Sequence, residues 1–217
     1  IFGTIVEQYV INTIMHQTML ASKLSRVVNV AKGKALGFVP VRTHGVDSAL
    51  KSIRIGKMLG FNQAHMLMST FRENVSTTGG LFSTHYFMLS FKKEIEAFEA
   101  LAKYGGNNMA VLIDTYNFDQ GVKNFISTAL ISKQKGSPMK AIAIDSGDLE
   151  ILSRKARRML DKADLKEVKI VVASNLDEYS IAKLVNKNAP IDVYAPCTEI
   201  LNVTDAPKLE VVYKMSE

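Results

Sequence analysis

The sequence has very few of the residues that usually mark a secreted or a low-complexity chain. It contains one cysteine, Cys197, in 217 residues, which excludes an internal disulfide framework and fits a reducing compartment. Thirteen glycines and five prolines exclude a collagen-like composition. Neither sign of charge dominates, since 27 lysines and arginines stand against 21 aspartates and glutamates. The resulting charge of +6 suits phosphorylated small molecules and nucleic acid about equally.

Long apolar runs and the common nucleotide or metal motifs are also missing. The first twenty residues are apolar, but Glu7, Asn12 and His16 interrupt them and no basic segment precedes them. A buried amphipathic helix is therefore predicted there in place of a signal peptide or membrane span, and we expect a cytoplasmic protein with no membrane contact. The chain has no P-loop, GxGxxG, CxxC or HExxH motif, so none of the sites that these motifs build is expected.

What the sequence does contain is an alternation of strand-like and helix-like segments. Predicted helices cover residues 5–31, 47–59, 63–71, 92–105, a stretch ending near 135, 149–162 and 177–186. Predicted strands cover residues 35–41, 109–116, 139–146, 168–175, 191–195 and 208–214. Such alternation predicts βα units and a parallel sheet. We expect a single α/β domain over residues 1–217, with an irregular or incomplete (β/α) barrel favoured over a doubly wound sheet.

Polar residues gather where the predicted strands end. Residues 114–116 (Asp-Thr-Tyr), 145–148 (Asp-Ser-Gly-Asp) and 174–175 (Ser-Asn) each follow a strand, and Arg42 with Thr43 follows the first one. In a βα barrel or an open parallel sheet, ligands bind at the carboxyl edge of the strands. The architecture therefore predicts a site at this edge.

The stretch AIDSGDL, residues 143–149, admits more than one interpretation. Ser146 or Asp148 could cap the helix that follows, because serine and aspartate are preferred at that position. Alternatively, Asp145 and Asp148 could accept hydrogen bonds from the two hydroxyls of a ribose, with Gly147 allowing close approach of the sugar. The same two carboxylates could also bind Mg²⁺.

The other candidates are isolated side chains. His85 lies among aromatic residues, where a lone histidine is usually structural, and it gains a role if a carboxylate such as Asp114 orients it. Arg42 could contact a phosphate or be an exposed structural arginine. The turn at Cys197 and Thr198 could present backbone N–H groups to an anion, whereas the basic run 154–158 is expected to be a solvated helix face.

Taken in order, these motifs resemble one known family. The segments that carry the resemblance are QTMLASKLSR, VRTHG, THYFMLSF, EIEAFEALA, VLIDTY, IDSGDL, VVASN followed by LDEY, and VVYK. They resemble the nicotinate phosphoribosyltransferases through nearly the whole chain, and the related nicotinamide enzymes share part of the pattern. The resemblance covers only the central part of such an enzyme. The chain begins with Ile1, and the family's amino-terminal domain and carboxyl-terminal segment are expected to lie outside it.

The resemblance implies a fold and a reaction. The fold is that of type II phosphoribosyltransferases, an irregular α/β barrel, usually in a homodimer with shared sites. The reaction condenses nicotinate with phosphoribosyl pyrophosphate in the presence of Mg²⁺, giving nicotinate mononucleotide and pyrophosphate in NAD salvage. Hydrolysis of ATP is coupled to it through a phosphohistidine.

The resemblance also implies roles for individual residues. His85 matches the phosphorylated histidine, and Asp114 matches the acid that orients it. Asp145 and Asp148 match acids of the ribose and pyrophosphate site, and Arg42 matches a substrate-site arginine. Further residues are expected to complete the substrate site or its phosphate loop: Ser146, Gly147, Ser174, Asn175, Cys197 and Thr198.

Several positions depart from the family pattern and leave alternatives open. Ala143 stands where the family usually has an arginine, and Val41, residues 81–82 and residues 196–197 replace other arginine or glycine positions. An enzyme of NAD salvage is one hypothesis. A non-catalytic relative that binds a protein or RNA within a larger assembly is the other, while an unrelated sugar-phosphate barrel enzyme would explain the acids but not the ordered motifs.

Overall fold

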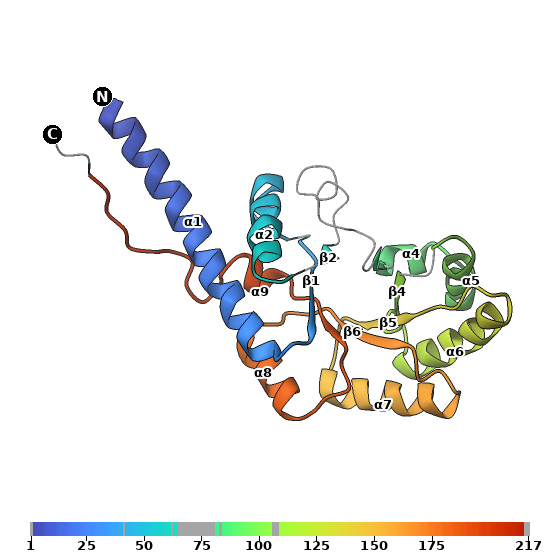
Figure 1. Cartoon of the computed structure of the whole chain (residues 1–217). Helices are drawn as coiled ribbons and strands as arrows, with labels where there is room; N and C mark the ends of the chain where they lie inside the picture. The colour runs from blue at the N-terminus through green and yellow to red at the C-terminus, as the bar shows by residue number, and fades with distance from the viewer. Residues whose placement is uncertain are drawn as a thin grey trace.

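The fold is known from a computed structural model that describes residues 2–40, 42–61, 63–64, 81–82, 84–105 and 109–214 (Figure 1). The strands are β1 (Ala35–Phe38), β2 (Gln63–Ala64), β3 (Leu81–Phe82), β4 (Met109–Leu112), β5 (Ala141–Ile144), β6 (Lys169–Val172) and β7 (Val193–Tyr194). The helices are α1 (Phe2–Ala31), α2 (Val46–Met58), α4 (His85–Leu89), α5 (Glu94–Tyr104), α6 (Phe118–Gln134), α7 (Leu149–Lys162), α8 (Glu178–Asn186) and α9 (Thr198–Leu201).

The strands form one parallel sheet in the order β2-β1-β7-β6-β5-β4-β3. Neighbours in the sheet are consecutive in the chain, except that β1 pairs with β7 and so joins the first strand to the last. This is the order of a (β/α) barrel, opened between β2 and β3 in the part of the chain that is described. The predicted incomplete barrel is confirmed, and the strand order does not reverse as it would in a doubly wound sheet.

The alternation of side chains gives the sheet two different faces. Phe38 faces the helices, because a Cβ added to Gly56 of α2 would lie 1.9 Å from the tip of its ring. The strand register places large side chains beside it on that face: Leu36, Tyr194, Val172 and Ile144. Small residues alternate with these and line the inner face near the carboxyl edge: Gly37, Ala195, Ala173 and Ala143. The inner face therefore carries small side chains next to the strand-end acids.

Most predicted elements are confirmed, with bounds that agree to within four residues, and two are not. The predicted strand over residues 208–214 is wrong, since residues 206–214 form no strand and are mostly exposed. Its alternating pattern favours a strand, but these residues pair with no neighbour in the described sheet. Residues 63–64, predicted to begin a helix, form β2, and residues 65–71 of that prediction lie outside the described residues.

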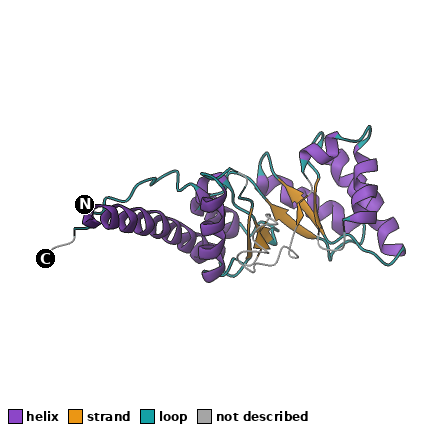
Figure 2. Cartoon of the chain, turned by 90° about the horizontal axis from the view of Figure 1, so that it is seen from above, coloured by secondary structure: helices purple, strands orange, loops and turns teal. Residues whose placement is uncertain are grey.

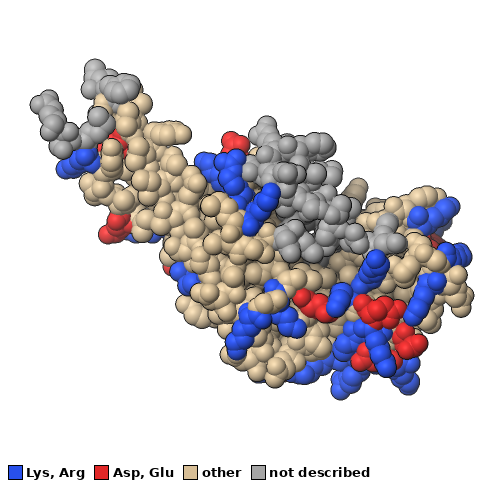
Figure 3. Space-filling view, viewed as in Figure 1, with Lys and Arg blue, Asp and Glu red and all other residues tan. Residues whose placement is uncertain are grey.

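Helix α1 has a buried half and a projecting half (Figures 1 and 2). Leu20, Leu24 and Val27 are at most 1% exposed and pack in the core. Near the amino terminus, by contrast, Ile5 and Tyr9 are 61% and 73% exposed, and Figure 3 shows mainly uncharged side chains there. Within the described residues, none of the helices combines the length and apolarity needed to cross a membrane.

A buried ionic cluster fastens α1 to the rest of the barrel. The ammonium of Lys23 lies 2.7 Å from Glu178 at the start of α8 and 2.8 Å from Asp205 after α9. Arg26 lies 2.7 Å from the other oxygen of Glu178. Lys23 is only 2% exposed and Glu178 only 3%. Buried charges are tolerated when they are paired in this way, so the cluster fixes α1 against α8.

The basic run on α7 is more structural than the sequence indicates. Arg157 donates hydrogen bonds to the carbonyl oxygens of Val168 and Leu165, at 2.7 and 2.9 Å, and pairs with Asp161. Lys155 pairs with Asp119 of α6 at 2.5 Å. Figure 3 shows basic and acidic side chains interleaved at this end of the molecule. The prediction of a merely solvated face is therefore wrong for Arg157.

Gly121→Ala is expected to destabilise the protein by about 1–3 kcal/mol or more, as overpacking does. A Cβ at Gly121 would lie 1.9 Å from the backbone oxygen of Ile113, so α6 would have to move away from the end of β4. Thermal or urea unfolding measures the change. Gly3→Ala is the matched control, because nothing lies within 4 Å of the added atom, and an equal loss in both variants would contradict the packing argument.

Candidate functional site

The acids predicted at the strand ends meet at the carboxyl edge of β4 and β5. Asp114 follows β4 and Asp145 follows β5 directly. The Oδ2 atom of Asp114 accepts hydrogen bonds from the backbone N–H of Asp145 at 2.8 Å and from the hydroxyl of Ser146 at 2.7 Å. Asp114 therefore holds the loop after β5 in place.

His85 completes this group from the first turn of α4. Its helix is capped by Thr84, whose side chain accepts a hydrogen bond from the N–H of Phe87. The Nδ1 atom of His85 lies 3.0 Å from the hydroxyl of Thr115, and Nε2 lies 3.5 Å from Oδ2 of Asp145. The side chains of His85 and Asp145 are 41% and 44% exposed, so a ligand in solution can reach them.

The contacts of the imidazole differ from the expected ones. The sequence suggested that Asp114 orients His85, but the carboxylate facing the ring in the structure is that of Asp145. The physical reason is that Asp114 already accepts two hydrogen bonds from the β5 loop. Asp114 thus contacts the backbone of the residue whose carboxylate faces the ring, and the hydroxyl of Thr115 lies beside the other ring nitrogen.

The environment of Asp145 favours its neutral form more than water does. Burial raises the pKa of its carboxyl most, and the negative charge of Asp114 raises it further. The nearby charges of His85 and Arg42 and a hydrogen bond with His85 lower the pKa, but they do not outweigh the first two causes. Asp145 is therefore expected to lose its charge at a higher pH than an ordinary aspartate.

Asp148 has the capping role that one of the sequence interpretations gave it. Its Oδ1 atom accepts a hydrogen bond from the N–H of Ile151 at 3.0 Å, in the first turn of α7. Gly147 precedes it with φ +78°, a left-handed conformation that glycine adopts at little cost. A Cβ at Gly147 would also lie 2.9 Å from Leu152. Capping by one oxygen does not prevent the other from binding a ligand.

Asp148→Ala is expected to cost about 0.5–2 kcal/mol of stability, the range for losing an amino-terminal cap. Asp148→Asn keeps an oxygen that can accept the hydrogen bond of Ile151, so it should unfold close to the original protein. Comparing the two by urea denaturation separates the cap from any role of the charge. A loss in Asp148→Asn equal to that in Asp148→Ala would contradict the cap assignment.

The remaining predicted residues lie at neighbouring strand ends. The guanidinium of Arg42 is near enough for its charge to act on Asp145, and the Arg42 carbonyl accepts a hydrogen bond from Asn202 at 2.7 Å. Ser174 is half-buried, its carbonyl accepts from the N–H of Leu176, and Asn175 is exposed. These residues rim the site, and their binding roles stay predictions.

The turn at Cys197 serves the fold in the described structure. Cys197 is 7% exposed and its thiol donates to the carbonyl oxygen of Val39 at 2.8 Å. The hydroxyl of Thr198 lies 3.7 Å from the same sulfur. These contacts join the ends of β1 and β7, and anion binding by this turn stays a prediction.

Thr115 and Glu94 have no individual role that their sequence context predicts. Thr115 stands beside Asp114 in a strand-end triplet, so its position was the available signal. Glu94 is an acid in the first turn of α5 that is nevertheless 8% exposed. Nothing in its local sequence distinguishes it from a solvated acid at a helix start.

The acids of the site offer few ligands for Mg²⁺. The described residues contain no group of three or more histidine, cysteine, aspartate or glutamate side chains placed to hold a metal ion. Mg²⁺ commonly takes only one or two carboxylates and completes its shell with phosphate oxygens and water. Asp145 and Asp148, three residues apart on one loop, fit that limited role.

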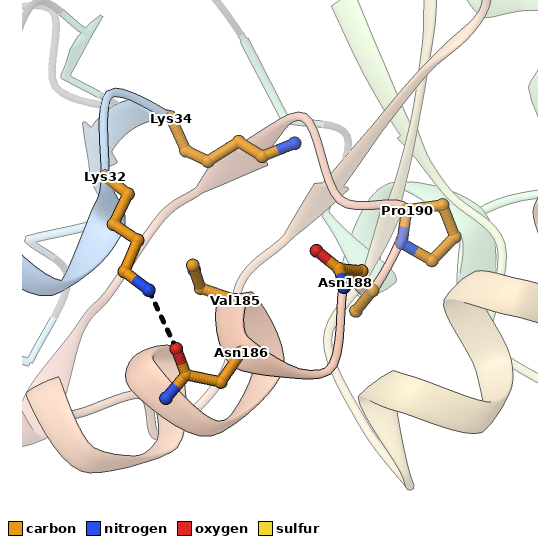
Figure 4. A pocket seen from close by; sticks show the side chains of 7 residues that line it. Lys32, Lys34, Val185, Asn186, Asn188 and Pro190 are labelled. Carbon is orange, nitrogen blue, oxygen red and sulfur yellow. Dashed lines mark hydrogen bonds between the residues drawn. The ribbon is translucent and has the colours of Figure 1, made fainter.

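A separate pocket of about 490 Å³ lies at the opposite, amino-terminal edge of the sheet (Figure 4). It is lined by the ends of α1 and α8, and Lys32 donates a hydrogen bond across it to Asn186 at 2.9 Å. Lys34 and Asn188 extend along its wall (Figure 4). None of the predicted strand-end acids lines this pocket.

The fold and the arrangement of the acids and histidine define the chain as an open parallel (β/α) barrel with a candidate site at the carboxyl edge of its strands. No protein-family model matches the chain. The chain is, however, 37% identical over 214 residues to a nicotinate phosphoribosyltransferase of Mycobacterium tuberculosis. The aligned residues make up 97% of this chain and 45% of that protein. It is 33% identical over 215 residues to the Bacillus subtilis nicotinate phosphoribosyltransferase, covering 97% and 43%. The chain belongs to the nicotinate phosphoribosyltransferase family and spans less than half the length of these relatives.

Solved structures share the fold. Human nicotinic acid phosphoribosyltransferase superimposes with a TM-score of 0.80 at 21% identity, over 88% of this chain and 49% of that one. The nicotinate-nucleotide pyrophosphorylase of Pyrococcus furiosus gives a TM-score of 0.77 at 15% identity, over 94% and 51%. At these identities the likeness establishes the fold and confirms the barrel predicted from the sequence.

Proposed function

We propose that the protein to which this chain belongs is a nicotinate phosphoribosyltransferase of NAD salvage. It would join nicotinate to the anomeric carbon of phosphoribosyl pyrophosphate and release pyrophosphate. The observation that carries this proposal is the meeting of His85, Asp114 and Asp145 at the carboxyl edge of a barrel whose sequence relatives bear that name.

The chemistry assigns a task to each of these side chains. As the bond from the anomeric carbon to pyrophosphate breaks, that carbon gains positive charge before its bond to nicotinate forms. The carboxylate of Asp145 would stabilise this charge, and Asp114 would hold the carboxylate's loop in place. Arg42 would contact the phosphate groups of the substrate. Five further residues would contact the sugar and its phosphates: Ser146, Gly147, Asp148, Ser174 and Asn175. The turn at Cys197 and Thr198 would contribute a phosphate loop.

His85 would connect the site to ATP. Its imidazole would accept the terminal phosphoryl group of ATP, releasing ADP, and later lose it to water. Thr115 and Asp145 would fix the orientation of the ring through its two nitrogens. Mg²⁺, when bound, would neutralise charge on the pyrophosphate, with Asp145 and Asp148 as its protein ligands.

The same proposal includes a homodimer and a cytoplasmic location. The dimer rests on the family resemblance, and the location on the single buried thiol, which suits a reducing compartment. Size-exclusion chromatography with light scattering measures the first.

The test uses the complete protein, including residues that lie outside this chain. Incubation with nicotinate and phosphoribosyl pyrophosphate is expected to give nicotinate mononucleotide, at a higher rate with ATP. Chromatography of the products measures the rate, and nicotinamide in place of nicotinate measures base preference. The proposal fails if the folded protein neither forms product nor binds either substrate in calorimetry.

Ala143 favours a second candidate, a non-catalytic relative within a larger assembly. It is fully buried on the inner face of β5, two residues before Asp145, where the resemblance expects an arginine. Without that charge, a charge-assisted contact to phosphate is missing. This candidate predicts that the protein copurifies with a protein or RNA partner and that His85→Ala leaves the association intact. Purification as a free, active homodimer would argue against it.

A further inference from the structure

The pocket at the amino-terminal edge of the sheet is lined by groups that the proposed chemistry does not use (Figure 4). It lies between two connections of the chain: residues 32–34, which join α1 to β1, and residues 186–190, which lead from α8 to β7. Strands β1 and β7 pair directly, with Ala35 opposite Val193. Two neighbouring βα units therefore build the pocket, and its volume of about 490 Å³ is that of a small-molecule site.

The polar side of the pocket carries positive charge. Lys32 and Lys34 line it, and in the described part of the chain neither of them forms an ion pair with an acid. The ammonium of Lys32 donates to the side-chain oxygen of Asn186, a neutral group, at 2.9 Å. Asp192, the acid closest to the second connection along the chain, is paired with Lys169 at 3.1 Å. The two ammonium groups are therefore available to an anion.

The ends of α1 and α8 also lie at the pocket, and the carbonyl end of a helix disfavours anions. Its partial charge is about −0.5 for each helix, which is less than the charge of the two ammonium groups. Backbone N–H groups moreover bond to the last carbonyls. The carbonyl of Ala31 accepts from Lys34 and that of Leu184 accepts from Ala189, each at 3.0 Å. The net field in the pocket is therefore positive.

The other side of the pocket is apolar. Val185, Ala189 and Pro190 line it, and the first and last of these are only half-buried. An inorganic anion would leave this side in contact with water. An organic group joined to the anion would cover it and remove apolar surface from water. The lining thus fits a ligand with one anionic and one apolar part.

We propose that this pocket binds a small phosphate ester, with its phosphate on Lys32 and Lys34 and its organic group against Val185 and Pro190. Lysine binds phosphate as a point charge, and its three N–H donors let Lys32 keep its bond to Asn186 while it contacts the phosphate. The pocket and the strand-end acids lie at opposite edges of the sheet. Binding here does not rest on the proposed function.

Three probes separate the two parts of the ligand in calorimetry of the complete protein. Phenyl phosphate carries both parts, inorganic phosphate carries only the anion, and phenol carries only the ring. We expect phenyl phosphate to bind more tightly than phosphate, phenol not to bind, and the affinity for phenyl phosphate to fall with rising salt. Equal affinities for phosphate and phenyl phosphate, or no binding of phenyl phosphate, would overturn the proposal.

Lys34→Met is expected to weaken the binding of phenyl phosphate about 10-fold, the effect of losing one hydrogen bond to a charged group. Lys34 makes no side-chain hydrogen bond in the described part of the chain, so its urea midpoint should stay close to that of the original protein. Lys208→Met removes an exposed lysine that pairs with Glu210 and is the matched control. Equal affinities in the two variants would overturn the proposal.

Chemical labelling shows where the probe binds. Acetic anhydride modifies exposed lysines, and mass spectrometry of the peptides measures the rate at each one. Phenyl phosphate should slow the modification of Lys32 and Lys34 and leave that of Lys208, whose side chain is 76% exposed, unchanged. Binding of the probe at the carboxyl edge alone would leave the rates at Lys32 and Lys34 unaltered, and that result would overturn the proposal.

Discussion

Replacing Lys23 by methionine is expected to destabilise the protein by about 3–5 kcal/mol, the usual cost of removing one partner of a buried ion pair. The ammonium of Lys23 lies within 2.8 Å of both Glu178 and Asp205, and the residue is 2% exposed. Methionine preserves most of the unbranched apolar stem, so the loss reports mainly the missing charge. Glu178 would remain buried with Arg26 as its remaining partner in the cluster. Urea denaturation measures the difference in unfolding free energy. The slope of that free energy against urea concentration should be the same in both proteins.

Two controls separate this effect from a general effect of losing lysine. Lys208→Met breaks an exposed pair with Glu210 and should cost about 0–1 kcal/mol. The double variant Lys23→Met with Glu178→Leu removes both buried charges and should recover much of the loss, because apolar residues replace buried pairs at little cost. A single variant as stable as the Lys208 control would contradict the prediction.

The stability that the cluster contributes is lost at low pH. Burial raises the pKa of Glu178, but its bonds to Lys23 and Arg26 outweigh this and lower the pKa below 4.5. The bond to Lys23 lowers the pKa of Asp205 below 3.8. Stability from these carboxylates is therefore fully present above these ordinary values and is lost as the pH falls through the lowered ones. The difference between the original protein and Lys23→Met should shrink below about pH 4.

The order of the barrel could be predicted from the sequence because its strands are short, apolar and separated by amphipathic helices. The bounds predicted for residues 149–162 coincide with α7, whose apolar and charged faces are the most clearly separated. The predicted strand over residues 208–214 failed because strand propensity needs a pairing partner, which local sequence does not reveal. The fastening of α1 by Asp205, 182 residues away, is likewise invisible in a local pattern.

The location of the site could be predicted, but not its internal contacts. The rule that parallel strands end at one edge was enough to bring Asp114 and Asp145 together. The sequence predicted Asp114 as the partner of His85, whereas the carboxylate of Asp145 faces the ring in the structure. The reason is that the β5 loop donates two hydrogen bonds to the carboxylate of Asp114. The burial of Glu94 could not be predicted, because it follows from how α5 packs on α6 and not from its neighbours in sequence.

Asp145→Asn in the complete protein is expected to lower kcat/KM for phosphoribosyl transfer by about 10²–10³-fold, the usual loss when one preorganised electrostatic contact to the reacting centre is removed. Asparagine keeps the shape of the side chain and the backbone N–H that donates to Asp114. The loss therefore reports the charge of the carboxylate, which would act on the reacting carbon, on Mg²⁺ and on His85. Burial and the charge of Asp114 raise the pKa of Asp145, so the original activity should also fall as the pH drops through this raised value.

Two further variants make this expectation specific. Asp164→Asn changes an exposed carboxylate at a left-handed position that asparagine tolerates, and it should leave kcat/KM unchanged. His85→Ala should abolish the stimulation by ATP, because phosphoryl transfer to the imidazole becomes impossible, while the transfer without ATP is reduced less. If Asp145→Asn were as active as Asp164→Asn, the carboxylate would have no electrostatic role, and binding of the sugar hydroxyls would remain its only task at the strand edge.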